Sequence, residues 1–161
     1  MKQEQLNEQP KKKYIEVQYS ALTQGYLREY CTTHGFDIST KFDGKKIDPD
    51  EFDFHSTVVF SSSEHIIDNS EMDVHVMVYP KNFALFGEKQ NILVLEIESP
   101  ALLSLREYFV NEYDMQDEFP DYRPHISLSY NYEGELPDVE LPNADLLEAD
   151  RLKIKDQKVF K

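Results

Sequence analysis

The feature that most constrains this chain is an order of predicted elements that occurs twice and ends each time in the same polar pair. Residues 14–60 follow the order strand, helix, polar loop and strand, and residues 91–130 repeat it. Each final strand carries a histidine followed two residues later by a hydroxyl residue, in FHSTVVF and in PHISLSY. Strand–helix–strand order alone is common, so it is the matching ends that indicate an internal duplication. Two such units packed together predict an α+β domain with two small facing sheets and helices outside.

Strands are predicted where β-forming residues alternate, and helices where apolar residues recur at helical spacing. Thr23 and Gly35 are expected to begin and end the first helix. Ser99 is the expected N-cap of the second helix, with Pro100 as its first residue. The two central strands, joined through Pro80, are expected to form a hairpin. The expected strands are 14–19, 54–60, 73–79, 83–88, 91–99, 125–130 and 146–155.

The length of 161 residues suits a single domain. Residues 1–12 are polar and are expected to form a flexible leader. The domain proper is then 13–161, with repeat halves at about 14–63 and 91–132. Cys31 is the only cysteine, which excludes an internal disulfide and a cysteine-based zinc site and fits a reducing cytoplasm.

The net charge of −14 bears on the partners that this chain can have. A long nucleic acid would be repelled unless a basic patch intervened, and the KKK at 11–13 is too short to be one. No stretch approaches 18 apolar residues, and the N-terminal residues lack the apolar run of a signal peptide. We therefore expect a cytoplasmic protein with a small substrate and no long nucleic acid, membrane or obligate protein partner.

The two polar pairs are His55 with Thr57 and His125 with Ser127. Residues two apart in a strand point to the same face, about 6.5–7 Å from each other, so each histidine shares a face with its hydroxyl. The expected faces are His55, Thr57 and Val59 against Phe54, Val58 and Phe60, and His125, Ser127 and Ser129 against Ile126, Leu128 and Tyr130. If the halves pack about a pseudo-two-fold axis, two imidazoles and two hydroxyls meet across one cleft.

Two histidines on opposite sides of a phosphodiester can divide the proton transfers between them. A neutral ring accepts a proton from the attacking oxygen, a protonated ring donates one to the leaving oxygen, and an ordinary pKa of about 6.5 suits both. Thr57 and Ser127 can donate hydrogen bonds to the non-bridging phosphoryl oxygens. We therefore expect His55, Thr57, His125 and Ser127 to be catalytic in a scheme that needs no metal or other cofactor.

A single His-x-Thr pair in a strand usually marks a half-buried structural histidine, so the second copy is what favours catalysis. The other histidines are expected to be structural: His34 beside Gly35, His65 in a polar turn and His75 in a strand. The main alternative chemistry is a zinc site built from the histidines and nearby carboxylates, although hydroxyls are poor zinc ligands. A serine nucleophile is disfavoured because neither hydroxyl sits in a glycine-flanked elbow.

FHSTVVF and PHISLSY resemble the signatures of the 2H phosphoesterase superfamily, which is defined by two His-x-Thr/Ser motifs on symmetric halves. The repeat covers about 14–132, most of the chain. Within the superfamily the chain is most similar to the phage anti-CBASS phosphodiesterases, in its size, motif spacing, acidic composition and PHISLSY motif. The resemblance implies two pseudo-symmetric lobes with small antiparallel sheets facing a central cleft. It also implies metal-independent hydrolysis of the 3′–5′ bonds of cyclic di- and trinucleotide immune signals in a host bacterial cytoplasm.

The same resemblance implies substrate-binding residues. That family sandwiches the bases between aromatic rings, including a tyrosine near the first strand, and uses a glutamate near the C-terminus; Tyr19 and Glu148 are the matching residues. The family can also stack bases on tryptophan, which this chain lacks, so tyrosine or phenylalanine must replace it. Two other functions stay open. One is an RNA-end or 2′,3′-cyclic or 2′–5′ phosphodiesterase of the same superfamily, and the other is a non-catalytic cyclic-nucleotide-binding sponge.

Overall fold

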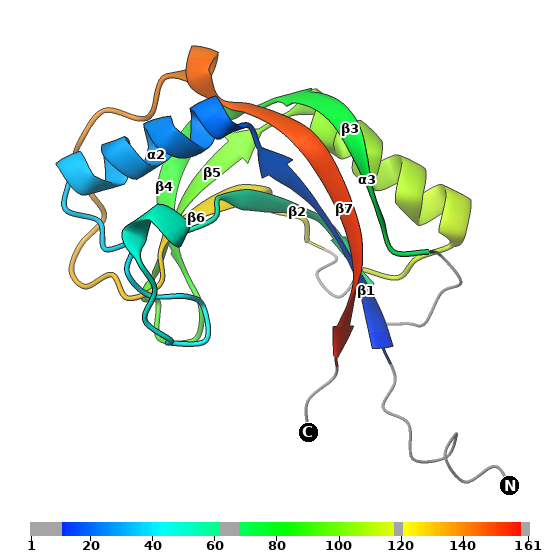
Figure 1. Ribbon diagram of the computed structural model, residues 1–161, viewed down its shortest axis with the longest axis horizontal. Helices are drawn as coiled ribbons and strands as arrows, with labels where there is room; N and C mark the ends of the chain where they lie inside the picture. Colours follow the sequence, from blue (N-terminus) through cyan, green and yellow to red (C-terminus); the bar gives the residue numbers. More distant parts are fainter. Residues whose placement is uncertain (1–10, 62–67, 118–120, 159–161) are drawn as a thin grey trace, which may run out of the picture.

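The strands form a curved arch, and the two longer helices lie on its outer side (Figure 1). The computed structural model describes residues 11–61, 68–117 and 121–158. The strands are β1 (Lys11–Tyr19), β2 (His55–Phe60), β3 (Ser70–Met77), β4 (Tyr79–Phe86), β5 (Ile92–Glu98), β6 (His125–Ser129) and β7 (Glu148–Lys158). The helices are α2 (Ala21–Thr33) and α3 (Pro100–Tyr113), with 3-10 turns at Pro49–Glu51 and Ala144–Leu146. No helix in the described part of the chain is long and apolar enough to cross a membrane.

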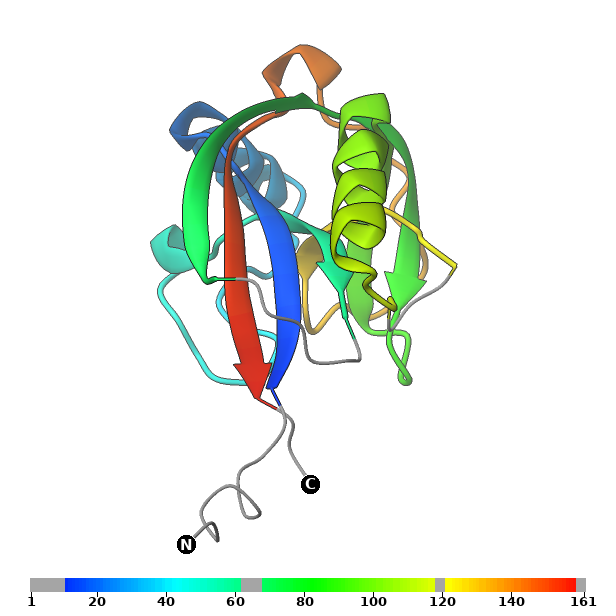
Figure 2. The ribbon, with the colours of Figure 1, turned by 90° about the vertical axis from the view of Figure 1, so that its right-hand side faces the viewer.

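The strands form two antiparallel sheets. One has four strands in the order β2-β1-β7-β3, and the other has three in the order β4-β5-β6. Figure 2 shows β3, β7 and β1 side by side in the larger sheet. The predicted α+β class with two small antiparallel sheets is confirmed.

The strands that carry the polar pairs, β2 and β6, lie at the edges where the two sheets meet. Ser56 in β2 donates a hydrogen bond from its hydroxyl to the backbone oxygen of His125 in β6, at 2.7 Å. This bond joins one sheet to the other between the two histidines of the motifs. We refer to β2 and β6 as the motif strands.

The order β1–α2–β2 is matched by β5–α3–β6, and each helix starts at a serine. Ser99 caps α3 and Pro100 is its first residue, as expected. The prediction for α2 is wrong in one residue, because the cap is Ser20 rather than Thr23. Thr23 is buried, and its hydroxyl donates to the Leu146 carbonyl oxygen at 2.6 Å, tying α2 to the turn before β7.

The expected hairpin between the central strands is wrong. β3 pairs with β7 and β4 pairs with β5, so the chain passes from one sheet to the other. Only Val78 separates the two strands, and it is fully buried. A tight hairpin needs at least two turn residues, commonly with positive φ, and this connection has no room for them.

The first strand starts earlier than expected. β1 begins at Lys11, inside the predicted leader, because Lys11 and Lys12 pair with the end of β7. Residues 1–10, which hold the rest of the predicted leader, lie outside the described residues.

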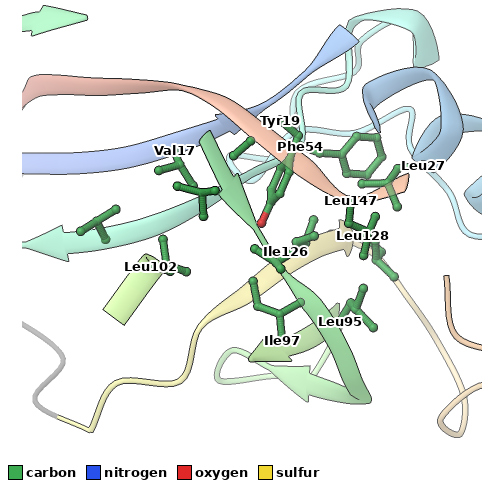
Figure 3. Packing of buried hydrophobic residues seen from close by; sticks show 14 of the residues in the cluster. Val17, Tyr19, Leu27, Phe54, Leu95, Ile97, Leu102, Ile126, Leu128 and Leu147 are labelled. Carbon is green, nitrogen blue, oxygen red and sulfur yellow. The ribbon is translucent and has the colours of Figure 1, made fainter. Parts of the chain in front are cut away.

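One hydrophobic core takes side chains from both halves of the chain (Figure 3). Its buried members include Val17, Tyr19, Leu27, Phe54, Leu95, Ile97, Leu102, Ile126, Leu128 and Leu147. Each large aliphatic side chain buried in this way stabilises the fold by about 1.5–3 kcal/mol. Because both motif strands contribute to the same core, packing holds their polar faces in a defined relation.

Candidate active site

The histidines of the two motifs are held in the same way. Each is the first residue of its strand. Nδ1 of His55 lies 3.3 Å from the backbone oxygen of Asp53, and Nδ1 of His125 lies 2.8 Å from that of Arg123. A carbonyl oxygen only accepts hydrogen bonds, so Nδ1 carries the proton in both rings. In the neutral form Nε2 then holds the lone pair, and it is the atom through which each ring can exchange a proton.

His125 borders a pocket of about 390 Å³ that Thr57 also lines. Phe86 and Tyr122 supply aromatic surface to this pocket, and Arg123 supplies a positive charge. The Arg123 guanidinium lies over the Phe86 ring, 4.5 Å from its centroid. This pocket therefore offers a flat apolar surface beside a cation.

His55 borders a second pocket, of about 520 Å³. Its lining includes the rings of Phe42 and Tyr130 and the ammonium-bearing side chain of Lys155. Phe42 is 72% exposed although it is a large apolar side chain. Both pockets reach the same stretch of β2, since His55 lines one and Thr57 the other. We call the surface that carries both pockets the cleft.

A β-bulge interrupts β2 directly after Thr57. The register against β1 shifts there, which makes Val58 an extra residue in the strand. Val58 and Val59 are both buried, and Phe60 lies opposite Tyr14. The expected alternation is therefore wrong beyond Thr57, because a bulge reverses the faces of the residues that follow it.

An equivalent bulge follows Ser127 in β6, where the register against β5 shifts and Leu128 is the extra residue. Ser129 is buried instead of facing the cleft. Tyr130 packs against the edge of the core, lines the pocket of His55, and has the Ser127 side chain as a hydrogen-bond partner. The structure thus brings both histidines and both hydroxyls to one side of the motif strands.

Burial makes His125 a neutral histidine. Desolvation lowers its pKa below the ordinary value, the hydrogen bond to the Arg123 carbonyl opposes this, and the charge of His55 lowers it further. The edge of the Phe86 ring packs against the imidazole, with 4.7 Å between ring centroids. A neutral ring with its proton on Nδ1 is a base at Nε2.

His55 has carboxylates on both sides. Oε1 of Glu16 lies 4.0 Å from its Nε2, and Oδ2 of Asp53 lies 4.0 Å from its Nδ1. Burial raises the pKa of Asp53, while the charge of His55 lowers it. Glu16 is 1% exposed and is paired with Lys155, whose Nζ lies 3.1 Å from Oε1.

These same three side chains are the group that could hold a metal ion. One ligand atom from each of Glu16, Asp53 and His55 lies within 4.8 Å of the others. The ammonium of Lys155 already bonds one Glu16 oxygen and competes with a cation for it. Metal-independent chemistry therefore stays a prediction, and a chelator tests it.

The sequence matches the family described as "Anti-CBASS protein Acb1" over residues 11–153. That range includes both motif strands and most of the chain. The chain belongs to the anti-CBASS protein Acb1 family. The resemblance that the two motifs indicated is confirmed, and the chain is a phosphodiesterase with an anti-CBASS role.

A solved structure agrees with this assignment at the level of the fold. A crystal structure of a phosphoesterase superimposes with a TM-score of 0.54 and 13% sequence identity, covering 94% of this chain and 96% of that chain. No match was found among curated protein sequences.

Tyr19 does not reach the cleft of this Acb1-family chain, which corrects its expected role in base stacking. It is 3% exposed and lies in the core (Figure 3). Its hydroxyl lies 2.7 Å from Ser56 Oγ. Because Ser56 donates its own proton to the His125 backbone oxygen, Tyr19 is the donor in the bond between them. The residue ends β1 on the core face, because alternation from Val17 places it there.

Glu148 lines neither pocket of the cleft, and its expected role in substrate binding stays a prediction. It opens β7 opposite Met77 of β3, and its carboxylate pairs with Nε2 of His75 at 2.5 Å. Both side chains of this pair are solvent-exposed to a substantial degree, at 39% and 69%. His75 thus has a structural partner, whereas His65 lies outside the described residues.

Sequence reasoning missed several residues at the site. Tyr122 donates from its hydroxyl to the Thr57 backbone oxygen at 2.7 Å. The Arg106 guanidinium lies over the Tyr122 ring at 4.3 Å, pairs with Asp117 and bonds the backbone of β2. Of the residues near the site, only Glu16 could have been identified from the sequence, because a carboxylate within a predicted strand is unusual.

Proposed function

We propose that this chain hydrolyses the 3′–5′ phosphodiester bonds of cyclic di- or trinucleotide signals, as a phage counter-defence enzyme acting in the bacterial cytoplasm. Family membership supports the substrate class. The observation that carries the chemistry is the pair of histidines, each with Nδ1 held by a backbone carbonyl, at adjoining pockets of one cleft.

In the proposed reaction Nε2 of one neutral imidazole accepts the proton of the attacking oxygen as that oxygen bonds to phosphorus. The bond from phosphorus to the leaving oxygen breaks, and the other ring, protonated, donates its Nε2 proton to that oxygen. Thr57 and Ser127 donate hydrogen bonds to the non-bridging oxygens, where negative charge accumulates. A free water or a ribose hydroxyl can supply the attacking oxygen with the same proton balance.

The surroundings of the two rings favour one division of these tasks. His125, whose pKa is lowered by burial, is the better general base because it is neutral near pH 7. The imidazolium form of His55 has two carboxylates within 4.0 Å and suits the general acid. The leaving oxygen then faces the pocket of Phe42 and Tyr130.

The cleft suits a small anionic ligand with flat bases. Its two pockets are each large enough for one nucleoside and present Phe86 on one side and Phe42 with Tyr130 on the other. Since the chain carries a net charge of −14, local cations such as Arg123 and Lys155 must attract the phosphates. These rings take the stacking role that Tyr19 cannot have.

The test is a panel of cyclic di- and trinucleotides, 2′,3′-cyclic nucleotides and 2′–5′-linked oligonucleotides, incubated with the protein in EDTA and resolved by chromatography. Linear products from the cyclic 3′–5′ substrates alone support the proposal. Cleavage confined to the other two classes would indicate an RNA-end enzyme. Tight binding without products would indicate a sponge, and loss of activity in EDTA with rescue by one divalent ion would indicate a metal at Glu16, Asp53 and His55.

A further inference from the structure

Each motif hydroxyl has a tyrosine hydroxyl bonded to it. Tyr14 OH lies 2.6 Å from Thr57 Oγ1, and Tyr130 forms the corresponding bond with Ser127. We infer that Tyr14 and Tyr130 are positioning residues that turn the hydroxyl protons of Thr57 and Ser127 towards the phosphoryl oxygens. The inference rests on the proposed function, since it assumes a phosphodiester held between the two motifs.

The argument starts from the single proton of a hydroxyl group, which can serve one hydrogen bond as a donor, while the oxygen can accept two. If Thr57 donated to Tyr14, it would have no proton left for a phosphoryl oxygen. If Tyr14 donates, Thr57 accepts through a lone pair and its own proton stays free for the substrate. A phenol is more acidic than an alcohol, and a more acidic group is the stronger donor.

Burial keeps the proton on the Tyr14 phenol. Desolvation raises its pKa far above the ordinary value, the hydrogen bond with Thr57 opposes this rise, and the charge of Glu16 adds to it. The ring is also held in place, because Phe60 packs edge-on at 5.8 Å and the Lys155 ammonium lies 5.3 Å from the ring centroid. Tyr14 is therefore a fixed, neutral donor next to Thr57.

Thr57 itself is held from the other side. Its backbone oxygen accepts a hydrogen bond from Tyr122 at 2.7 Å. With the main chain and Oγ1 each bonded to a phenol, the remaining freedom of Thr57 is the direction of its own hydroxyl proton. That proton is the one that can reach a ligand in the pocket shared with His125.

The second phenol reaches its hydroxyl by another route. The bulge at Leu128 returns Tyr130, the residue after β6, to the side of Ser127, three residues earlier in the chain. Burial raises the Tyr130 pKa, the hydrogen bond with Ser127 opposes this rise, and the charges of Asp53 and Glu16 add to it, so this phenol also keeps its proton. The Tyr130 ring packs against Phe52 with 5.7 Å between centroids.

A third pair of a tyrosine with a hydroxyl residue differs from the first two in where its hydrogen bonds end. Tyr19 donates to Ser56 at 2.7 Å, but the Ser56 proton is used on the His125 backbone oxygen. Both residues are buried, so this chain of donors, from Tyr19 through Ser56 to the His125 backbone oxygen, ends inside the protein. At Thr57, which lines the pocket of His125, the same chain of donors is left open towards the cleft.

The experiment is a double-mutant cycle on turnover at saturating substrate. Tyr14→Phe and Tyr130→Phe each remove one oxygen, and each should lower kcat by about 2–13-fold, the rate equivalent of one neutral hydrogen bond. In a Thr57→Val background Tyr14→Phe should change kcat no further, and in a Ser127→Ala background Tyr130→Phe should change it no further. Tyr30→Phe is the matched control, because its phenol bonds the Glu140 backbone oxygen and the residue lines neither pocket of the cleft; its kcat should not change.

An equal loss of kcat with and without Thr57 would overturn the inference, because Tyr14 would then act by another route. A loss confined to the melting temperature would overturn it too. Running the cycle on bis(p-nitrophenyl) phosphate as well as on a cyclic dinucleotide separates the inference from the proposed function. If only the simple diester were turned over, the proposed substrate would be refuted, and the double-mutant cycle could still be measured on that diester. If neither compound were turned over, both the proposed function and the inference would be overturned.

Discussion

The half of the cleft around His55 and the half around His125 share a motif, a bulge and a carbonyl acceptor, yet differ in charge. His55 stands between two carboxylates with an ammonium nearby. His125 stands against an aromatic ring beside Arg123, and burial lowers its pKa. A repeated backbone plan therefore carries two chemically different imidazoles, which is what a reaction with one acid and one base requires.

The hydroxyls differ in a parallel way. Thr57 is bonded by Tyr14 of the neighbouring strand, whereas Ser127 is bonded by Tyr130, which directly follows the end of its own strand. The bulge position is shared, but the residue three places after the hydroxyl is Phe60 in one half and Tyr130 in the other. The same local function is thus served from different positions, which a comparison of the two sequence halves does not predict.

The largest expected effect comes from removing either imidazole. His55→Ala and His125→Ala should each lower turnover by roughly 10²–10⁴-fold, the range for loss of a general acid or base, with little change in folding. Turnover is measured by chromatography and folding by circular dichroism. His75→Ala is the control, since His75 is a surface histidine paired with Glu148. If either histidine variant folded and kept near wild-type turnover, the assignment of one histidine as general acid and the other as general base would be contradicted.

The next effect is that of the hydroxyls. Thr57→Val and Ser127→Ala should each lower kcat by about 10–10³-fold, if each acts as one donor to the developing charge. Valine is nearly isosteric with threonine, so packing should survive at Thr57. Steady-state kinetics and melting temperature are measured together. A change in melting temperature with no change in kcat would assign these residues to structure.

The two pockets can be compared through their aromatic rings. Phe86→Ala and Phe42→Ala should each raise KM for a cyclic dinucleotide by about 5–150-fold, because one base stacked on an aromatic ring contributes about 1–3 kcal/mol. Tyr108→Ala is the control, since Tyr108 is an exposed aromatic residue on α3, outside the cleft. If only one of the two variants affected KM, one nucleoside would be bound and the other would lie in solvent.

Tyr19 offers a sharper contrast within the same measurement. Tyr19→Phe should leave KM unchanged and lower the free energy of unfolding by about 1–3 kcal/mol, because Ser56 loses a buried donor. A rise in KM at unchanged stability would indicate that Tyr19 contacts the substrate after all.

The smallest expected effect is a pH dependence of stability that comes from His125. The folded pKa of His125 is lowered, so the folded state binds fewer protons than the unfolded state, whose histidine has a pKa of about 6.5. The free energy of unfolding should therefore fall as pH drops from above the ordinary value through the lowered pKa. His125→Asn should remove this part of the loss, since its amide can still donate to the Arg123 carbonyl oxygen. Urea unfolding at pH 8 and pH 5 measures the difference, and equal losses in both proteins would contradict it.

The sequence by itself determined the repeated order of elements, the α+β class and the four motif residues. These rest on local properties: alternation in a strand, spacing in a helix and the cap at Ser99 with Pro100. The apolar and polar faces of β2 and β6 up to Thr57 and Ser127 are likewise set by alternation. Such features need only the identity of near neighbours in the chain.

Tertiary structure alone decided where the strands pair and hence what surrounds the motifs. The bulges after Thr57 and Ser127 arise from the register against β1 and β5, and no residue type in the motif strands announces them. That register buried Val59 and Ser129, set Phe60 edge-on against Tyr14 and placed Tyr130 in the lining of the His55 pocket.

Partners distant in sequence were decided in the same way. Tyr14 and Thr57 are 43 residues apart, and Ser56 and the His125 backbone 69 apart, so each contact exists only once the sheets are paired. Tyr19 was expected in the cleft because it ends the first strand, but burial depends on which face the core covers. Short-range pattern thus specifies the candidate catalytic groups, while the long-range pairing of strands specifies the charges and donors that make the two groups different.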